Sequence, residues 1–188
     1  MSSITPLFTT LLQTLNYPPP KDLLDYVQEL NPLLSVERSN RLGYQSKSHK
    51  IEQLTPVLEF IDQNVYTKEL RHGEAWVNIN PTGAYNVSHI HPNSDYTFVY
   101  YLTDDNSTIY LTHPHLYEQH NHLLSVQPEV RQTYSLEHYH TISPNKGDIL
   151  VFPSYVPHHV ESNNKYTDRI SISWNSDSTR VPRVWRTV

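Results

Sequence analysis

Two histidines separated by one residue, His89 and His91, are the feature of the sequence with the clearest chemical potential. In a β-strand, side chains at positions i and i+2 project from the same face, so the two imidazoles can bind one cation. Imidazole suits mid-series transition metals such as Fe(II). A third candidate ligand, His158, lies further along the chain, and Arg169-Ile170-Ser171 follows it. Because Arg binds carboxylates through two parallel hydrogen bonds, this pattern favours a metal centre that also holds an anionic chelating ligand.

Several longer runs accompany these residues in a fixed order. They are Trp76-Val77-Asn78, His89-Ile90-His91-Pro92, Val99-Tyr100-Tyr101-Leu102, Gly147-Asp148-Ile149-Leu150-Val151-Phe152-Pro153-Ser154, and the run RISISWN over residues 169–175. In this order the chain resembles the Fe(II)/2-oxoglutarate dioxygenase superfamily. Within it, the chain is most similar to a subfamily of 2-oxoglutarate-Fe(II) oxygenases of marine bacteria and their phages. The resemblance spans roughly residues 39–175 and includes a loop at residues 39–46.

The resemblance implies a mainly β fold, a double-stranded β-helix (a jelly roll, cupin-like) with N-terminal α-helices packed outside. It also implies that His89 and His158 are metal ligands. Arg169 is expected to bind the distal carboxylate of 2-oxoglutarate, with Ser171 as a supporting hydrogen-bond donor. In prolyl hydroxylases the second Tyr of a Tyr-Tyr-Leu strand binds that same carboxylate, and this position corresponds to Tyr101. The expected cofactors are therefore Fe(II) and, as cosubstrate, 2-oxoglutarate.

The implied activity is that of a dioxygenase, which uses O2 and 2-oxoglutarate to hydroxylate an unidentified substrate and releases succinate and CO2. His91 occupies the position where the superfamily usually has a carboxylate. The i, i+2 geometry favours His91 as the third metal ligand, with Asp95 as an alternative that would have to fold back across Pro92. Two other functions stay open: a three-His, cupin-type metalloenzyme that does not use 2-oxoglutarate, and a non-catalytic jelly-roll binding or virion module. The module is suggested by Thr97-Phe98, where the subfamily usually has Ser-Gly.

Composition excludes several other classes of protein. A net charge of −5 provides no electrostatic attraction to nucleic acid, so no such partner is expected. The chain has no Cys, which rules out disulfide scaffolds and thiolate metal sites. The N-terminal residues lack the features of a signal peptide, and no run approaches the length of a membrane span, so a cytoplasmic location is expected. A homo-oligomer stays open.

The periodic spacing of apolar residues predicts the helices and strands that must position the candidate residues. Residues 21–31 and 51–65 show helical spacing of apolar residues, with Thr55 as N-cap and Pro56 in the first turn of the second helix. Short runs rich in β-branched and aromatic residues predict strands at residues 75–79, 97–102, 108–112, 148–152 and 169–174. We expect a single domain, residues 1–188, with a helical N-terminal part over 1–70 and a jelly-roll core over 75–180.

Strand alternation makes further predictions about side-chain directions. Thr97, Val99 and Tyr101 should share one face, expected to be the inner one. His159 should point away from the face that carries His158. Six further histidines fall in residues 113–140, an expected long connection or irregular hairpin. Their irregular spacing favours surface histidines over a second metal site; they are His113, His115, His120, His122, His138 and His140.

Overall fold

The structure, a computed structural model, describes residues 9–31, 34–104, 108–115, 121, 123–134 and 136–179. Its elements in chain order are β1 (Gln13–Asn16), α1 (Lys21–Gln28), β2 (Asn40–Arg41), β3 (Tyr44–Gln45), the 3-10 turn η2 (Glu52–Leu54), α2 (Thr55–Asn64), β4 (Leu70–Asn80), β5 (Tyr85–His89), β6 (Tyr96–Tyr101), β7 (Ile109–Thr112), α4 (Pro128–Tyr134), β8 (Tyr139–Ile142), β9 (Asp148–Pro153), β10 (His158–Val160) and β11 (Arg169–Ser178). None of the helices within the described residues is long and apolar enough to cross a membrane.

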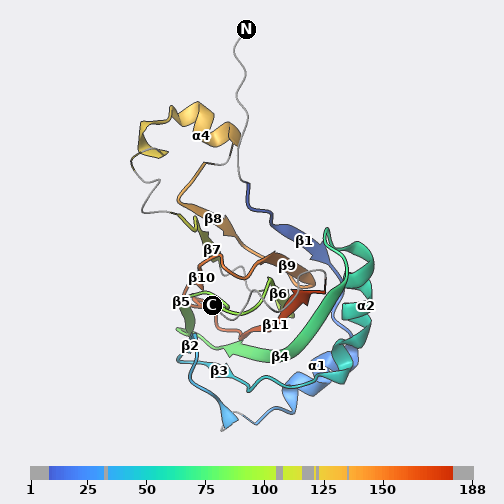
Figure 1. The fold of residues 1–188 in the computed structure, drawn as a ribbon. Coiled ribbons are helices and arrows are strands. Elements are labelled where there is room, and N and C mark those ends of the chain that lie inside the picture. The colour runs from blue at the N-terminus through green and yellow to red at the C-terminus, as the bar shows by residue number, and fades with distance from the viewer. Residues whose placement is uncertain are drawn as a thin grey trace.

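Within the described residues the strands form two antiparallel sheets, which Figure 1 shows as the two sides of a sandwich. One sheet has six strands in the order β1-β9-β6-β11-β4-β3, and the other has five in the order β2-β5-β10-β7-β8. Strands distant in sequence therefore lie side by side, as when β11 pairs with both β4 and β6. This confirms the expected fold class, a mainly β jelly roll.

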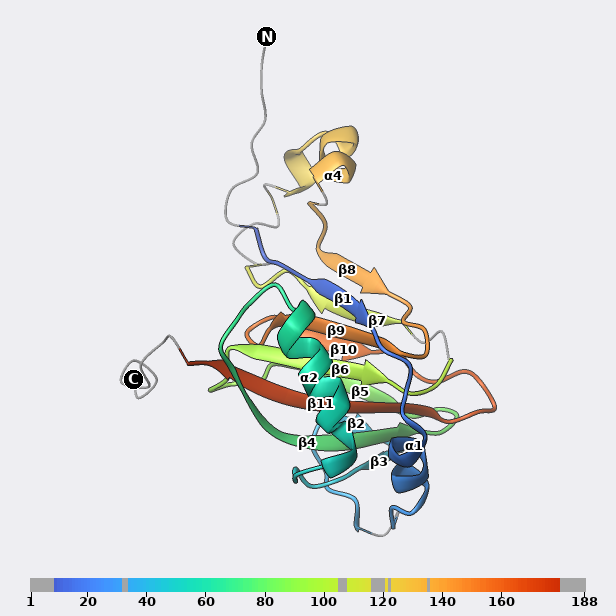
Figure 2. The same ribbon diagram turned by 90° about the vertical axis from the view of Figure 1, so that its right-hand side faces the viewer.

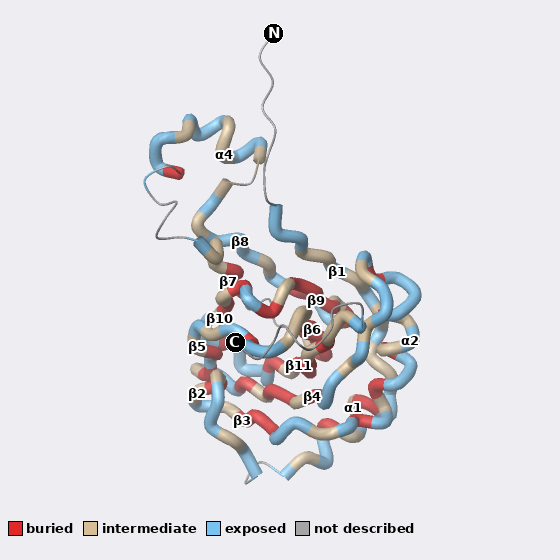
Figure 3. The backbone as a smooth tube through the Cα atoms, viewed as in Figure 1, coloured by how far each residue is buried: buried red, intermediate tan, exposed pale blue. Residues whose placement is uncertain are grey.

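The residues of β6 alternate between two apolar layers. Phe98 and Tyr100 face the layer between the six-stranded sheet and the helices, whereas Val99 and Tyr101 face the layer between the two sheets. Both layers are buried, which explains why the strand is apolar or aromatic at nearly every position. Figure 3 shows this burial along the strands that line the sandwich. The predicted inner face of this strand is thus confirmed for Val99 and Tyr101.

The two N-terminal helices cover the outer face of the six-stranded sheet, as Figure 2 shows. α1 buries Leu23 and Val27, and α2 buries Val57 and Ile61. Each pair is spaced i, i+4, so one stripe of each helix packs on the sheet while the opposite side stays in solvent. Helices packed outside the jelly roll were expected, and the structure confirms them.

Some predicted boundaries were wrong. Helix α1 ends at Gln28 and does not continue to residue 31. Thr55 is not the N-cap of α2, because Leu54 takes that position and Thr55 is already helical. The preceding 3-10 turn explains the difference: the Thr55 hydroxyl donates a hydrogen bond back to the carbonyl of Glu52, at 2.7 Å. Pro56 does lie in the first turn, as predicted.

The N-terminal part is more than a helical cover, because it also supplies β1, β2 and β3. β1 pairs with β9, β2 with β5, and β3 with β4, so this part extends both sheets. The stretch at 113–140, expected to be a long connection or irregular hairpin, is described by the structure at residues 113–115, 121, 123–134 and 136–140. Its flanking strands β7 and β8 pair with each other, and Figure 1 shows α4 standing away from the sheets on this connection.

Candidate active site

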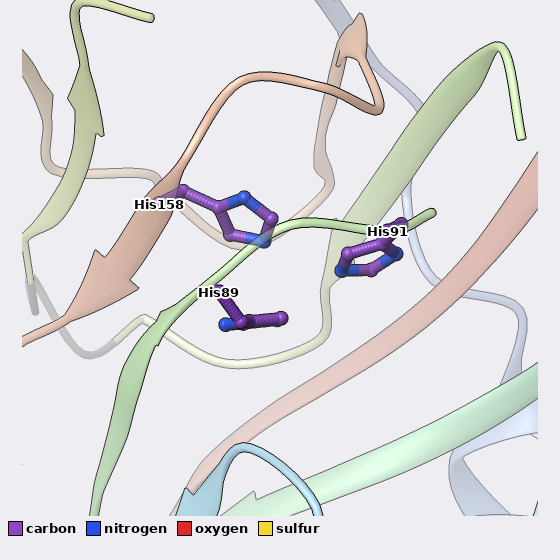
Figure 4. A group of neighbouring side chains, drawn as sticks. All are labelled: His89, His91 and His158. Carbon is purple, nitrogen blue, oxygen red and sulfur yellow. The ribbon is translucent and has the colours of Figure 1, made fainter. Parts of the chain in front are cut away.

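Three imidazole rings meet between the two sheets. His89 is the last residue of β5 and His158 the first of β10, and the two are direct partners in the antiparallel pairing of these strands. His91 follows just beyond the end of β5. One ring nitrogen of each histidine lies within 4.8 Å of the others, and Figure 4 shows the three rings turned toward a common space. The structure thus brings together the three histidines that the sequence singled out.

His91 reaches this space by a different route from the one alternation suggests. It lies outside the strand, where its backbone N–H donates to the carbonyl of Ser154 at 3.0 Å. Its ring packs against Trp76 of β4, with ring centroids 5.4 Å apart. His91 is therefore held by a backbone hydrogen bond to the segment after β9 and by ring packing on β4, and not by hydrogen bonds between paired strands.

Hydrogen bonds at the Nδ1 atoms define which nitrogen of each ring is available. His89 Nδ1 lies 2.8 Å from the carbonyl oxygen of Val87, and His158 Nδ1 lies 3.0 Å from that of Val156. His91 Nδ1 lies 2.6 Å from Oδ1 of Asn175. Since these oxygens only accept, each Nδ1 carries the proton and donates it. The Nε2 atom of each ring is then left with its lone pair, which is the form that binds a metal.

Burial keeps the three imidazoles neutral. His91 and His158 are buried and His89 is half-buried. Desolvation is the largest cause that lowers the pKa of all three rings, to about 4 for His91 and to about 3 for His158. The hydrogen bond to Asn175 opposes the lowering at His91, and the neighbouring His89 adds to it. Near neutral pH the cluster therefore offers uncharged donor atoms, as metal binding requires.

Asp95, the alternative third ligand, lies outside this cluster. Its Oδ2 accepts a hydrogen bond from the backbone N–H of Ser178, at 2.7 Å. Its own backbone is held on both sides, since its N–H donates to the carbonyl of Ser176 and its carbonyl accepts from the N–H of Ser154. These bonds direct the carboxylate toward β11. Among the described residues, the group of potential ligands contains His89, His91 and His158 alone.

The other predicted site residues line the same narrow cavity as the histidines: Arg169, Ser171 and Tyr101. Arg169 and Ser171 are two residues apart on β11, and Ser171 pairs directly with Tyr101 of β6. Arg169 is buried, with 2% of the residue exposed. Its Nη1 donates to the carbonyl of Glu161 and its Nη2 to Oδ1 of Asn86, both at 3.2 Å. A buried cation in the wall of a cavity beside three neutral imidazoles makes the cavity attractive to an anion.

Sequence reasoning assigned no role to several residues that also line the cavity, and they come from strands of both sheets and the loop before β2. They are Ser39, Trp76, Asn78, Asn86, Ile109, Val160 and Ser173. A signal existed for the residues of β4, because Trp76 and Asn78 alternate with Ala75, Val77 and Ile79. In β6, Thr97 is buried and hydrogen-bonded, whereas Phe98 points to the opposite layer and stacks on Trp174. Phe98 therefore does not narrow the cavity.

The other histidines among the described residues do not join the cluster. His159 faces away from His158, as predicted, and its ring stacks on Tyr110 with centroids 4.7 Å apart. His113 and His159 line a separate hollow together with Tyr139. His115 and His140 are exposed and His138 is half-buried, whereas His120 and His122 lie outside the described residues. Within the described part of the chain, no second group of three potential metal ligands occurs.

Comparison with known proteins agrees with this geometry. The sequence profile of the family described as "Putative 2OG-Fe(II) oxygenase" matches residues 74–175, more than half of the chain. This span includes all three histidines together with Arg169, Ser171 and Tyr101. No curated protein matches the chain by sequence.

Several solved structures share this fold. HygX from Streptomyces hygroscopicus, crystallised with nickel and 2-oxoglutarate, has a TM-score of 0.58 at 13% identity, and the match covers 91% of this chain and 84% of HygX. A Pseudomonas putida prolyl-4-hydroxylase has a TM-score of 0.52 at 18% identity, with coverage of 90% and 94%. A Burkholderia pseudomallei oxidoreductase of the 2OG-Fe(II) oxygenase family has a TM-score of 0.53 at 11% identity, with coverage of 88% and 84%. The fold, the site and the sequence profile agree, and the chain belongs to the 2OG-Fe(II) oxygenase family.

Proposed function

We propose that His89, His91 and His158 bind Fe(II), and that Arg169 anchors 2-oxoglutarate in the same cavity. The protein would then act as a dioxygenase on a substrate that is still to be identified. The observation that carries this proposal is that three imidazoles with closely spaced ring nitrogens and the buried Arg169 line a single cavity.

The donor set fits Fe(II). Three protein ligands on one side of a metal leave positions open for a chelating cosubstrate and for O2, as in non-haem iron oxygenases. Each ligand imidazole also has a fixed partner for its Nδ1 proton, which is the usual arrangement around metal-bound histidines. When bound, Fe(II) and 2-oxoglutarate supply the oxidising chemistry: O2 and 2-oxoglutarate are consumed, succinate and CO2 are released, and a C–H bond of the substrate is hydroxylated.

The chain itself contributes charge and positioning. Three neutral ligands leave the double positive charge of the metal uncompensated by protein, so a dianionic cosubstrate is favoured on electrostatic grounds. Arg169 would bind the distal carboxylate through two hydrogen bonds; Ser171 lies two residues away on the same strand, and Tyr101 lies on the neighbouring β6. Apolar side chains of the lining, Val99, Ile109 and Val160, limit the access of water and strengthen these interactions.

Anaerobic titration of the Fe(II)-loaded protein with 2-oxoglutarate tests the proposal. A visible charge-transfer band that saturates with 2-oxoglutarate is the expected result. Absence of both the band and measurable binding would contradict it. The alternative function is a metalloenzyme that does not use 2-oxoglutarate. The all-imidazole ligand set is the observation that favours it. Oxygen consumption that is unchanged when 2-oxoglutarate is left out would favour that alternative.

A further inference from the structure

The three histidines of the cluster differ in the groups that hold them. His89 and His158 each donate from Nδ1 to the backbone carbonyl two residues earlier, that of Val87 and that of Val156. No side-chain substitution removes these acceptors. His91 donates to a side chain, Oδ1 of Asn175 on β11, at 2.6 Å. The orientation of His91 therefore depends on the identity of one residue that lies far away in the sequence.

Asn175 is itself held by a chain of hydroxyl groups. Thr97 Oγ1 donates to Asn175 Oδ1 at 3.3 Å and lies 2.9 Å from Ser154 Oγ. Because Thr97 uses its proton toward Asn175, Ser154 is the donor toward Thr97. Thr97 and Ser154 are both fully buried. Two groups, His91 Nδ1 and Thr97 Oγ1, thus bond to Oδ1 of Asn175 and hold its amide plane.

These hydrogen bonds connect positions in the sequence runs to which the proposed function gives no role. Ser154 ends the run Phe152-Pro153-Ser154, and Asn175 ends the run RISISWN. Thr97 stands where the resembling subfamily has Ser, and it supplies the same hydroxyl. Ser154 contacts the site twice, since its carbonyl also accepts the backbone N–H of His91. β6, β11 and the segment after β9 therefore all act on one imidazole.

We propose that Asn175 is a positioning residue that sets the orientation and donor strength of His91, and that Thr97 and Ser154 order Asn175 for this task. The inference rests on the proposed function, in which His91 is a metal ligand. An acceptor on Nδ1 fixes the tautomer of a ligating histidine and makes its Nε2 a stronger donor, and loss of such a partner typically costs about 10–100-fold in metal affinity. A carboxylate in place of the amide would accept more strongly, which favours Fe(III) over Fe(II).

Metal titrations of three variants test this role without any measurement of turnover. Asn175→Leu removes the acceptor at similar volume, and Asn175→Asp keeps an acceptor and adds charge. Asn163→Leu is the matched control, because Asn163 is buried but bonds to the carbonyls of Asn80 and Thr167. Co(II) affinity is measured by visible absorption with chelator competition, and the thermal unfolding of each metal-free variant reports its fold. The Fe(III)/Fe(II) potential is measured on the iron-loaded proteins.

We expect Asn175→Leu to lose Co(II) affinity by about 10–100-fold. Asn175→Asp should bind within a few-fold of wild type, with a lower potential; a tenfold preference for Fe(III) corresponds to about 59 mV. Asn163→Leu should retain affinity even if it unfolds earlier. Equal losses of Co(II) affinity in Asn175→Leu and Asn175→Asp would overturn this inference but not the proposed function. A Co(II) affinity of Asn175→Leu that matches that of the control variant would do the same. A wild-type protein that binds neither Co(II) nor Fe(II) would overturn the proposed function and this inference with it.

Discussion

His158 and His89 stand directly opposite each other in the pairing of β10 with β5, with ring centroids 4.3 Å apart. The register between the two strands shifts immediately afterwards, so that Val160 pairs with Asn86. Because of this irregularity, Asn86 and His89 both line the cavity although strict alternation would place them on opposite faces. One irregular pair of strands thus supplies two histidines of the cluster and the side chain that contacts Arg169.

Arg169→Ala should weaken 2-oxoglutarate binding strongly while Fe(II) binding stays nearly unchanged. The variant removes a charge-assisted contact to a carboxylate in a desolvated cavity, at a cost of about 2–5 kcal/mol. The measurement is anaerobic titration with 2-oxoglutarate, with iron content determined separately. Arg71→Ala serves as the control, since Arg71 is half exposed and pairs with Asp177 on the surface. A 2-oxoglutarate affinity that stays within a few-fold in Arg169→Ala would show that another residue is the anchor.

His91→Ala should lose iron affinity by about an order of magnitude or more, because one of three ligand atoms disappears. Asp95→Asn should keep full metal content, since its side chain serves the N–H of Ser178 and lies outside the cluster. His91→Asp recreates a two-His, one-carboxylate set and should retain iron. Metal analysis after gel filtration measures all three. Full occupancy in His91→Ala together with metal loss in Asp95→Asn would reassign the third ligand.

The agreement between sequence and structure was best where a motif is local. The strands around residues 97–102, 148–152 and 169–174 were predicted within a residue or two at their N-terminal ends, because β-branched and aromatic runs bounded by turn residues are a local signal. The spacing of His89 and His91, and that of Arg169 and Ser171, is likewise local. The prediction of Thr55 as N-cap of α2 was wrong because its hydroxyl bonds back to Glu52 in the preceding 3-10 turn.

Contacts that depend on the register between distant strands could not be predicted. Asn86 contacts Arg169 only because of the shift between β5 and β10, and nothing in either strand alone reveals that shift. The pairing of β1 with β9 joins residues that are far apart in the sequence, such as Asn16 and Asp148. The hydrogen bond from His91 to Asn175 likewise joins two motifs that were recognised separately. Sequence patterns identified the residues of the site, but only the fold shows which of them contact one another.

Phe98→Ala should lower the free energy of unfolding by about 3–5 kcal/mol, the usual cost of emptying a buried phenylalanine site. Phe98 is fully buried and stacks on Trp174, with ring centroids 5.1 Å apart, in the layer between sheet and helices. Since that layer lies on the opposite face of β6 from the cavity, metal affinity should not change. Urea unfolding and Co(II) titration measure the two effects. A large change in metal affinity with little loss of stability would mean that Phe98 shapes the site after all.

His72 should make the metal-free protein sensitive to acid. It lies on β4, where Trp174 Nε1 donates to its Nδ1 at 3.2 Å, so that Nε2 carries the proton and faces Asp62 of α2 at 3.1 Å. Burial, as the largest cause, lowers the pKa of His72 below 6.5, against the opposing effect of Asp62. Between the folded pKa and 6.5 the unfolded chain therefore binds more protons than the folded one. The contribution of His72 to stability is full above pH 6.5 and is lost as the pH falls toward and through its folded pKa, with a slope of at most about 1.4 kcal/mol per pH unit.

His72→Gln isolates this contribution, because Gln does not titrate and its side-chain oxygen can still accept from Trp174. Urea unfolding of the metal-free wild type and variant, at a series of pH values from 8 down to 5, measures the difference. The other histidines are the same in both proteins, so their effects cancel when the two stability curves are subtracted. The variant should lose less stability than the wild type as the pH falls below 6.5. Parallel curves over the whole range would show that His72 is protonated equally in the folded and unfolded chains, and that its burial does not suppress its charge.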